Sequence, residues 1–516
     1  MNVINTSAKS TPLRRLTKAI LAVFVFHSLA PGFLLAQIVA DPNQPKQPTI
    51  HESANGTPQV NIQTPTQGGV SMNHYSQFDV DGKGAILNNS RKDTQTELGG
   101  YIKGNPWLST GEADIIVNQV NSANPSYLGG YIEVAGKKAD VIIANPSGLN
   151  IDGAGFINAN QAVLTTGEVL MNNGNLQGYN VHQGEINITG QGLDTRGVNY
   201  TQLLTTAANI NAGIWGNEIQ IVSGHYSMDK DGKITIDEDA DLTDKPKYAI
   251  DTKQLGGMYA GQITLVSTDR DRHVNLEGEV FASAGGVVIN ADGTISNSGV
   301  INSNQEKANI TINAQKVENS GTISSQYHQK ISAKEIINSG LMAARGELSV
   351  KAKHLTINQG SINAGRLDIT ADELTNKSGK IVQTGSQTLE INADHFSNIN
   401  NALVGSVPLD LGSGNGEDPT NPGNDRPDPT EQDPIQGGDG KPGTVETAPP
   451  LPPLILADGA INVKNIINDN GTITGNGEIH LTAAQSLIND GSIMHIGNLR
   501  LENGDFINKN GDLNLI

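Results

Sequence analysis

The sequence predicts an all-β protein, a right-handed parallel β-helix whose short strands stack coil upon coil. Two observations support this fold class. From residue 286 onward, an apolar residue, an asparagine and a glycine-bearing turn recur together about every 20 residues, which is the sequence period of a β-solenoid. The chain also contains 59 glycines and only 4% aromatic residues, a composition that is typical of turn-rich β architectures and unusual for large helical domains.

The repeats are clearest in residues 286–407, which we interpret as a first solenoid segment. Short strands of alternating polarity, such as residues 308–314 and 389–393, lie between the turns, and their apolar side chains would fill the interior of each coil. Because an asparagine recurs in every repeat, we expect a ladder of stacked amides along one corner. The asparagines concerned are Asn297, Asn319, Asn338, Asn358, Asn376 and Asn398. A leucine-rich horseshoe has a similar period, but its leucine pattern is missing.

Residues 408–453 interrupt this rhythm. They hold eleven of the chain's 22 prolines and nine acidic residues, a composition that cannot bury a core, so we predict a flexible, extended linker. The repeats resume in residues 454–516, at Asn468, Asn489 and Asn508. No polar cap follows the last repeat, and solenoids generally need capped ends, so we expect either a short protein of this kind or a truncated reading frame.

Residues 1–36 have the features of a secretory signal peptide. Four basic residues accompany an apolar stretch from Ala19 to Ala30, and cleavage after Ala36 fits the sequence. A membrane anchor is the alternative, but a span needs about 20 apolar residues, and Pro31-Gly32 interrupts this stretch. We therefore predict export to the periplasm and no membrane span.

Charge and cysteine content narrow the function further. A formal net charge of −19 argues against a protein that binds nucleic acid through phosphate contacts. The chain has no cysteine, whereas many exported proteins use disulfides as staples. A cysteine-free chain can cross a narrow pore unfolded, because no disulfide loop would block its passage.

Sequence motifs for catalysis are missing. The chain contains no Gly-x-Ser-x-Gly elbow, no Walker-type phosphate loop and no His-Glu-x-x-His zinc motif. We therefore predict that the protein is not an enzyme and uses neither a cofactor nor a metal. The enzymatic alternative is a polysaccharide lyase or hydrolase whose site is assembled across neighbouring coils.

Two Asn-Pro turns are the candidate functional site. The first is Asn105-Pro106-Trp107-Leu108, and the second is Asn145-Pro146-Ser147-Gly148-Leu149. An Asn side chain can bond to the backbone two residues on, proline presets φ, and Gly148 takes the place where a type I turn favours glycine. Taken alone, each turn would be a corner of a β fold.

The sequence around these turns resembles the N-terminal secretion domain of two-partner-secreted exoproteins, the filamentous haemagglutinin, haemolysin and contact-dependent inhibition group. The resemblance covers residues 60–270 and includes the segments 129–139, 155–160 and 164–167. The family carries motifs close to Asn-Pro-Asn-Leu and Asn-Pro-Asn-Gly-Ile. The positions that match are Asn105, Pro106 and Leu108 in the first turn and Asn145, Pro146 and Gly148 in the second. Trp107 and Ser147 replace the second asparagine of each motif, and Leu149 replaces the isoleucine.

The resemblance implies that residues 37–285 form a secretion domain that caps the N-terminal end of the solenoid. A TpsB-type β-barrel transporter of the outer membrane would recognise this domain in the periplasm, and the chain would cross unfolded and fold outside. The implied recognition residues are Asn105, Pro106, Leu108, Asn145, Pro146, Gly148 and Leu149. The protein would be secreted by a Gram-negative bacterium or held at its cell surface.

Two functions are consistent with such an exoprotein. The first is an adhesin or haemagglutinin-like protein whose solenoid contacts host or bacterial cell surfaces. The second is the N-terminal delivery part of a contact-dependent growth-inhibition toxin or a haemolysin. No segment of the sequence resembles a toxin domain, and the last residues continue the repeats.

Overall fold

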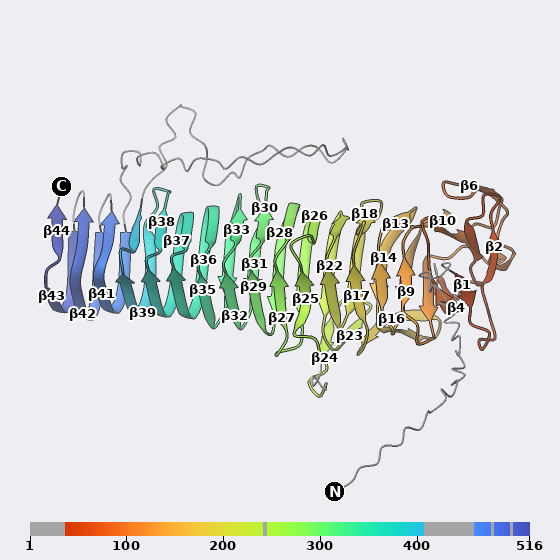
Figure 1. Ribbon diagram of the computed structural model, residues 1–516, viewed down its shortest axis with the longest axis horizontal. Coiled ribbons are helices and arrows are strands. Elements are labelled where there is room, and N and C mark those ends of the chain that lie inside the picture. Colours follow the sequence, from red (N-terminus) through yellow and green to blue (C-terminus); the bar gives the residue numbers. More distant parts are fainter. Residues whose placement is uncertain (1–36, 241–244, 407–458, 476–478, 496–498, 516) are drawn as a thin grey trace, which may run out of the picture. The chain divides into compact units, whose positions relative to one another are not determined.

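The computed structural model describes residues 37–240, 245–406, 459–475, 479–495 and 499–515, all within one compact unit (Figure 1). The predicted signal peptide, residues 1–36, and the predicted linker, residues 408–453, lie outside the described residues. Most described residues belong to β-strands, and most strands pair in parallel with the strand one coil later. The predicted all-β parallel solenoid is therefore confirmed.

Each coil turns through three faces, which we number in chain order. Face 1 contains β9 (Ser126–Leu128), β12 (Leu149–Ile151), β17 (Glu185–Ile188), β20 (Ala207–Ile210), β25 (Tyr248–Thr252), β27 (His273–Leu276), β29 (Thr294–Asn297), β32 (Lys316–Asn319) and β35 (Glu335–Asn338). Face 2 contains β3 (Pro58–Asn61), β5 (Ala85–Asn89), β10 (Tyr131–Gly136), β13 (Ala154–Ile157), β18 (Leu193–Thr195), β21 (Gly213–Gly216), β30 (Val300–Ser303), β33 (Thr322–Ser325), β38 (Lys380–Gln383), β40 (Leu403–Ser406) and β44 (Asp512–Leu515). Face 3 contains β4 (Val70–Phe78), β8 (Ile115–Val120), β11 (Ala139–Ala144), β14 (Ala159–Thr165), β19 (Tyr200–Thr205), β22 (Glu218–Ser223), β31 (Ile310–Asn313) and β34 (Gln329–Ser332).

Longer strands bend around the corners and contribute to more than one face. They are β26 (Gly257–Ser267), β28 (Glu279–Ala291), β36 (Leu341–Asn358), β37 (Ser361–Lys377), β39 (Leu389–Ile399), β41 (Gly459–Gly475), β42 (Ile479–His495) and β43 (Leu499–Asn508). Their register continues the same stacking, since β36 pairs with β33, β34 and β35 in turn.

Aliphatic side chains fill the interior of the stack. On face 1, Ile295, Val317 and Ile336 stand at one register in β29, β32 and β35, and each is fully buried. Similar stacks on the other faces join them into one core cluster that extends from Ile38 to Ile493. Removing this apolar surface from water is the main force that holds one coil on the next.

The predicted asparagine ladder is present at the end of the face 1 strands. Asn297 Nδ2 donates to Asn319 Oδ1 at 2.7 Å, and Asn319 Nδ2 donates to Asn338 Oδ1 at 2.7 Å. These amides are buried, so each rung satisfies polar groups that water cannot reach.

The prediction that Asn358 belongs to the ladder is wrong. Asn338 pairs in register with Ile357, so Asn358 lies one position beyond the ladder and is exposed. Ile357 takes the ladder position, is buried in the core and has no side-chain amide that could donate a hydrogen bond. The next member, Asn376, consequently keeps a buried Oδ1 without a hydrogen-bond partner.

The coils on the two sides of residues 407–458 stack directly on each other. β39 pairs with β41 from Leu389 opposite Gly459 to Ile399 opposite Asp469. The ladder also crosses this point, because Asn398 Nδ2 donates to Asn468 Oδ1 at 2.9 Å. The repeats before and after the predicted linker therefore belong to one stack.

Antiparallel strands are added at the N-terminal coils. β1 (Ile38–Ala40) pairs with β4, and β2 (Thr49–Glu52) pairs with β3. A hairpin of β6 (Thr94–Thr96) and β7 (Gly100–Ile102) packs on face 2, where Leu98 and Ile102 contact Ile86 and Ala135. The 3₁₀ helix η1 (Pro106–Leu108) follows this hairpin.

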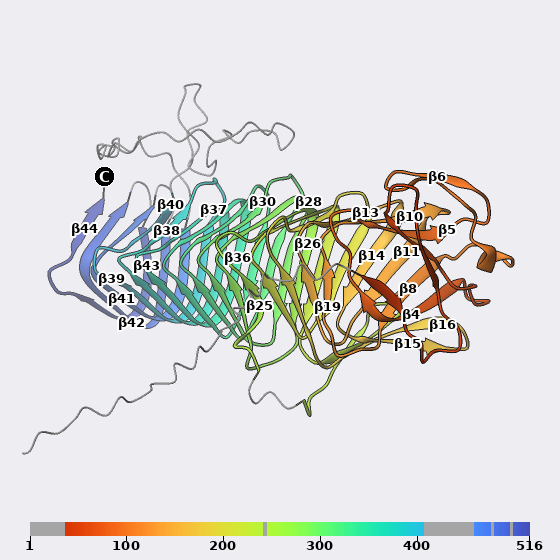
Figure 2. The same ribbon diagram turned by 45° about the vertical axis from the view of Figure 1, so that its right-hand side comes forward.

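A four-stranded antiparallel sheet, which the sequence did not lead us to predict, covers part of face 3. It consists of β15 (Glu168–Asn172), β16 (Asn175–Val181), β23 (Tyr226–Asp229) and β24 (Ile234–Ile236). Figure 2 shows β15 and β16 beside β4 and β8. Tyr179, Val181 and Tyr226 of this sheet pack on Ile142 and Val163 of the solenoid. The strands of face 3 are therefore buried on both sides here, as their continuous apolar runs require.

Candidate functional site

The first Asn-Pro turn begins the 3₁₀ helix η1. Asn105 Oδ1 accepts a hydrogen bond from the Trp107 backbone N–H at 2.9 Å, and Pro106 takes the first helical position, where its missing N–H costs nothing. The Asn105 Nδ2 group points inward and donates to the carbonyls of Ile62 and Asn88, both at 2.9 Å. One buried side chain thus joins the turn to two other segments of the first coils.

The rest of the first turn divides into a buried and an exposed half. Leu108 is fully buried in the main core. Pro106 is exposed, and Trp107 keeps 44% of its surface exposed although its Nε1 donates to Thr49 Oγ1 at 2.9 Å. Any partner that touches this turn in the folded protein meets Pro106 and Trp107 first.

The second Asn-Pro turn, at the start of face 1, has the same pattern of side-chain hydrogen bonds. Asn145 Oδ1 accepts from the Ser147 backbone N–H at 2.9 Å, and the Gly148 N–H donates to the Asn145 carbonyl at 3.0 Å. Asn145 Nδ2 donates to the Asn124 carbonyl and to Ser126 Oγ, both at 3.0 Å. The turn that we expected is therefore present, with its amide bonded to the preceding coil.

Gly148 and Leu149 connect this turn to the stack. Gly148 has φ of +115°, a value that favours glycine, and its carbonyl accepts from the Ser126 N–H at 3.1 Å. Leu149 begins β12 and is fully buried. Pro146 and Ser147 are half-buried, so the second turn exposes less surface than the first.

A groove of about 420 Å³ borders the second turn. Ser147, Gly148 and Asn150 form one side of it, Glu185 and Asn187 of the next coil form another, and Lys245 and Pro246 also contribute to its lining. The two motifs share their internal bonding and differ in how much of each turn is exposed.

A buried charged cluster anchors the antiparallel sheet to the solenoid. Asp269 accepts from the His225 backbone N–H at 2.8 Å, lies 3.0 Å from His225 Nδ1 and forms an ion pair with Arg272 Nη1 at 3.4 Å. Arg272 also donates to the carbonyls of Thr206, Pro246 and Tyr248. Because His225 begins the excursion that contains β23 and β24, and Pro246 ends it, this cluster fixes both ends of the insertion.

The electrostatics of the cluster follow from its burial. Burial alone would raise the pKa of Asp269, but hydrogen bonds from His225 and the charges of His225 and Arg272 bring this pKa below its usual value. Burial lowers the pKa of Arg272, against the attraction of Asp269. The sequence alone offered no signal for this cluster, since its members are separated by up to 66 residues.

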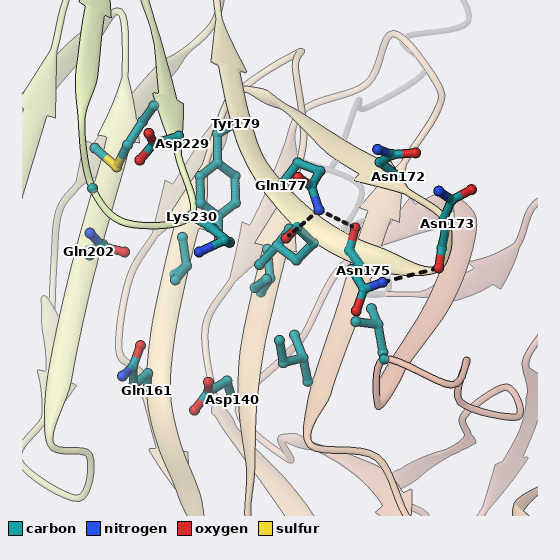
Figure 3. Close-up of a pocket in the computed structure, with 18 residues that line it drawn as sticks. Asp140, Gln161, Asn172, Asn173, Asn175, Gln177, Tyr179, Gln202, Asp229 and Lys230 are labelled. Atoms are coloured by element: carbon teal, nitrogen blue, oxygen red, sulfur yellow. Dashed lines mark hydrogen bonds between the residues drawn. The ribbon is translucent and has the colours of Figure 1, made fainter.

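A cavity of about 560 Å³ lies between the antiparallel sheet and face 3. Figure 3 shows Asp140 and Gln161 on the solenoid side, with Tyr179 and Lys230 on strands and turns of the added sheet. Burial raises the pKa of Asp140, while a hydrogen bond from Asn160 acts in the opposite direction. Amide groups dominate the polar lining, and no histidine, serine or cysteine is among the lining residues.

The described residues contain no group of three or more His, Cys, Asp or Glu side chains placed to hold a metal ion. Within the same part of the chain, no helix has the length and apolar character that crossing a membrane would require.

The fold and the two turns define a class of protein. A family model described as the TPS secretion domain matches residues 36–297, which is half of the chain. The chain therefore belongs to this family, and the resemblance inferred from the Asn-Pro motifs is confirmed.

Individual relatives are similar over the same N-terminal part. The chain is 53% identical over 290 residues to "Toxin CdiA" of Yersinia pestis, a match that covers 56% of this chain and 9% of that protein. It is 43% identical over 284 residues to "tRNA nuclease CdiA-2" of Burkholderia pseudomallei, a match that covers 55% of this chain and 9% of that protein. The matches thus span about a tenth of the length of these curated relatives.

Two solved structures are also similar. The crystal structure of the filamentous hemagglutinin secretion domain has a TM-score of 0.44 and 29% identity, covering 64% of this chain and 96% of that chain. The crystal structure of the HMW1 secretion domain from Haemophilus influenzae has a TM-score of 0.24 and 13% identity, and the match covers 92% of this chain and 96% of that chain.

Proposed function

We propose that residues 36–297 are an export address, recognised in the periplasm by a TpsB-type transporter of the outer membrane. The chain would then be secreted by two-partner secretion or held at the surface of a Gram-negative bacterium. The match to the TPS secretion domain carries this proposal, because it spans the part of the chain that holds both Asn-Pro turns. Coil-by-coil stacking supplies free energy for export without ATP, since each emerging coil adds to a folded template.

Within this address, Asn105 and Asn145 act as positioning residues. Their amides are buried and fully engaged inside the protein, so their role is to hold each turn in one conformation. The transporter then meets the outer side of the turns, which is most accessible at Pro106 and Trp107. The recognition motif that we propose is Asn105, Pro106, Leu108, Asn145, Pro146, Gly148 and Leu149. Its buried members, such as Leu108 and Leu149, act by holding the turns in place.

A secretion assay combined with a binding measurement tests this role. We expect Asn145→Ala to leave the protein trapped or degraded in the periplasm, whereas Ser147→Asn, which restores the residue of the family motif, is exported. Normal export of Asn145→Ala beside the wild type would overturn the role of this turn.

The binding arm separates recognition from folding. The purified chain is titrated with the transporter's periplasmic modules, using the wild type, Asn145→Ala and the surface variant Trp107→Ala. Weaker binding by Trp107→Ala, with an unchanged unfolding temperature, supports contact through the first turn. Equal affinity of all three proteins indicates that the turns only stabilise the nascent solenoid.

We further propose that the exported solenoid serves toxin delivery, the alternative to an adhesin or haemagglutinin-like function. The curated relatives support this choice, because their printed names describe toxins and tRNA nucleases. A small immunity reading frame downstream of this gene, together with growth inhibition of neighbouring cells that lack it, would support delivery. Cell adhesion without growth inhibition would favour the adhesin.

A further inference from the structure

Four aromatic side chains form a row along face 2. Tyr131 begins this aromatic row in β10, and Trp215, Tyr259 and Phe281 follow in β21, β26 and β28. The pairing register is continuous, because Tyr131 stands opposite Gly155, Gly155 opposite Asp194 and Asp194 opposite Trp215. Trp215 then stands opposite Tyr259, and Tyr259 opposite Phe281. Labels of several of these strands follow one another along one side of the stack in Figure 1.

Three of the four rings of the aromatic row, those of Tyr131, Trp215 and Tyr259, lie against glycines. A Cβ atom on Gly155 would collide with the ring of Tyr131, and one on Gly213 would collide with the ring of Trp215. A Cβ on Gly257 would stand 2.8 Å from the Tyr259 hydroxyl. Glycine therefore leaves room for each of these three rings to lie along the surface of the sheet instead of standing away from it.

The aromatic row points outward and is not part of the core. The neighbours of these residues along each strand, Ile132, Ile214, Met258 and Val280, fill the interior and are fully buried. Tyr131 keeps 38% of its surface exposed, and the other three rings are partly exposed. Trp215 and Tyr259 are stacked, with ring centroids 6.3 Å apart and planes inclined by 13°. The result is a nearly flat aromatic surface that solvent reaches.

Polar groups lie within the same row. The Tyr131 hydroxyl donates to Asp194 Oδ2 at 3.1 Å, and Arg196 donates to both oxygens of the Asp194 carboxylate. In the pairing register, Asp194 stands between Tyr131 and Trp215. Beyond Phe281, the register continues with Asn302 and Ser324, whose side chains can donate and accept hydrogen bonds.

We propose that the aromatic row binds an extended, uncharged polysaccharide chain laid along the axis of the stack. The faces of pyranose rings present C–H groups, which pack on aromatic rings, while their edges carry hydroxyls that bond to carboxylate, guanidinium and amide groups. The net charge of −19 disfavours a polyanionic chain such as nucleic acid or a sulfated glycan. Both the flat rings and the polar groups between them thus fit a neutral glycan.

The length of the row agrees with this occupant. Five steps between neighbouring strands separate β10 from β28, so at about 4.8 Å a step the row extends roughly 24 Å. An extended chain of about five sugar units has this length. An oligosaccharide of six units therefore covers the row, whereas a disaccharide reaches only neighbouring rings.

Tryptophan fluorescence provides a local test, because the chain has only two tryptophans, Trp107 and Trp215. The full chain is titrated with maltohexaose, cellohexaose, xylohexaose and chitohexaose, and with heparin as the anionic comparison. In the Trp107→Phe variant, a neutral hexasaccharide should shift the emission of Trp215. In the matched Trp215→Phe variant the remaining tryptophan, at the first Asn-Pro turn, should not respond. Absence of a response to every neutral hexasaccharide overturns the proposal.

Calorimetry measures the energetic contribution of the rings. Loss of one aromatic contact in Tyr259→Ala should weaken hexasaccharide binding about tenfold, while Phe506→Ala, an exposed aromatic far along the chain, should bind like the wild type. Circular dichroism confirms that both variants are folded. Unchanged affinity in a Trp215→Ala/Tyr259→Ala double variant, or tighter binding of heparin than of any neutral chain, contradicts the proposal. Neither the fluorescence titration nor the calorimetry depends on export, so their outcomes are independent of the proposed secretion function.

Discussion

At each Asn-Pro turn, one buried amide connects three groups from different stretches of the chain. Asn145 bonds to Ser147 within its own turn and to Asn124 and Ser126 of the preceding coil. The bond within the turn is local, and the Asn-Pro sequence predicts it. The other two bonds depend on which coil lies alongside, so the turn chemistry could not reveal them.

Removing the Asn145 amide should destabilise the solenoid measurably. Asn145→Ala leaves a buried hydroxyl, a carbonyl and an N–H without their partner, and we expect the free energy of unfolding to fall by about 2–4 kcal/mol. Asn145→Asp keeps the acceptor for Ser147 but buries a carboxylate against the Asn124 carbonyl, so its loss should be at least as large. Denaturant unfolding of both variants checks this. A change below about 0.5 kcal/mol, as expected for a surface substitution, would contradict the anchoring role.

The Asp269 carboxylate should make stability depend on pH in the acid range. Its pKa is lower in the folded protein than in the unfolded chain, so its contribution is fully present above the unfolded pKa of about 3.9 and is lost as pH falls through the folded value. Asp269→Asn should therefore cost about 3 kcal/mol at neutral pH, since it leaves Arg272 buried without its counter-charge. The difference between the two proteins should shrink below about pH 4.

Unfolding measured at neutral pH and at about pH 3 tests this pH dependence. Asp231→Asn is the matched control, because Asp231 is an exposed carboxylate that pairs with Lys230, and exposed ion pairs contribute little. A deficit of Asp269→Asn that stays constant or grows as the pH falls would contradict the assigned direction.

At the scale of elements, the asparagine ladder shows that a repeated phrase in the sequence does not place every one of its asparagines at the same position in the coil. The phrase around Asn358 resembles the others in sequence, but its asparagine comes one residue after the position that pairs with Asn338, and Ile357 takes the ladder position. Successive side chains of a strand point to opposite sides, so Ile357 is buried while Asn358 is exposed. Because this rung of the ladder is missing, the buried Oδ1 of Asn376 has no hydrogen-bond partner.

The ladder makes a clear prediction about two asparagines of the same phrase. Asn319→Ala breaks the bonds to Asn297 and Asn338 and should lower the free energy of unfolding by about 2–3 kcal/mol. Asn358→Ala, at the exposed position outside the ladder, should change it by less than about 0.5 kcal/mol. Equal effects of the two substitutions in chemical denaturation would show that the ladder does not stabilise the stack.

At the scale of the molecule, the stack continues across residues 407–458. The strands on both sides pair with each other, and the chain leaves face 2 at Ser406 and re-enters face 3 at Gly459. One coil earlier, residues 384–388 connect β38 to β39 at the equivalent corner. The stability of a solenoid held by contacts between neighbouring coils depends only weakly on the length of such a connection.

Replacing residues 407–458 with a copy of the corner 384–388 should therefore leave the stack folded. We expect the free energy of unfolding to rise by no more than about 2 kcal/mol, because shortening the loop about tenfold amounts to three to four halvings of its length, each worth about 0.6 kcal/mol. Thermal unfolding followed by circular dichroism measures this. Loss of the cooperative transition, or loss of protease resistance in residues 459–515, would show that the stack requires the replaced segment.

The sequence by itself determined the features that arise from neighbouring residues. The repeat spacing and the alternation of apolar residues specify short stacked strands, and Asn-Pro followed by Gly148 specifies a turn, because these signals act within a few positions. Only the tertiary structure decided which coil each buried amide bonds to, which asparagine joins the ladder and where a second sheet covers face 3. Those choices depend on segments tens of residues apart, such as His225 and Asp269, and no local pattern encodes which distant strand will lie alongside.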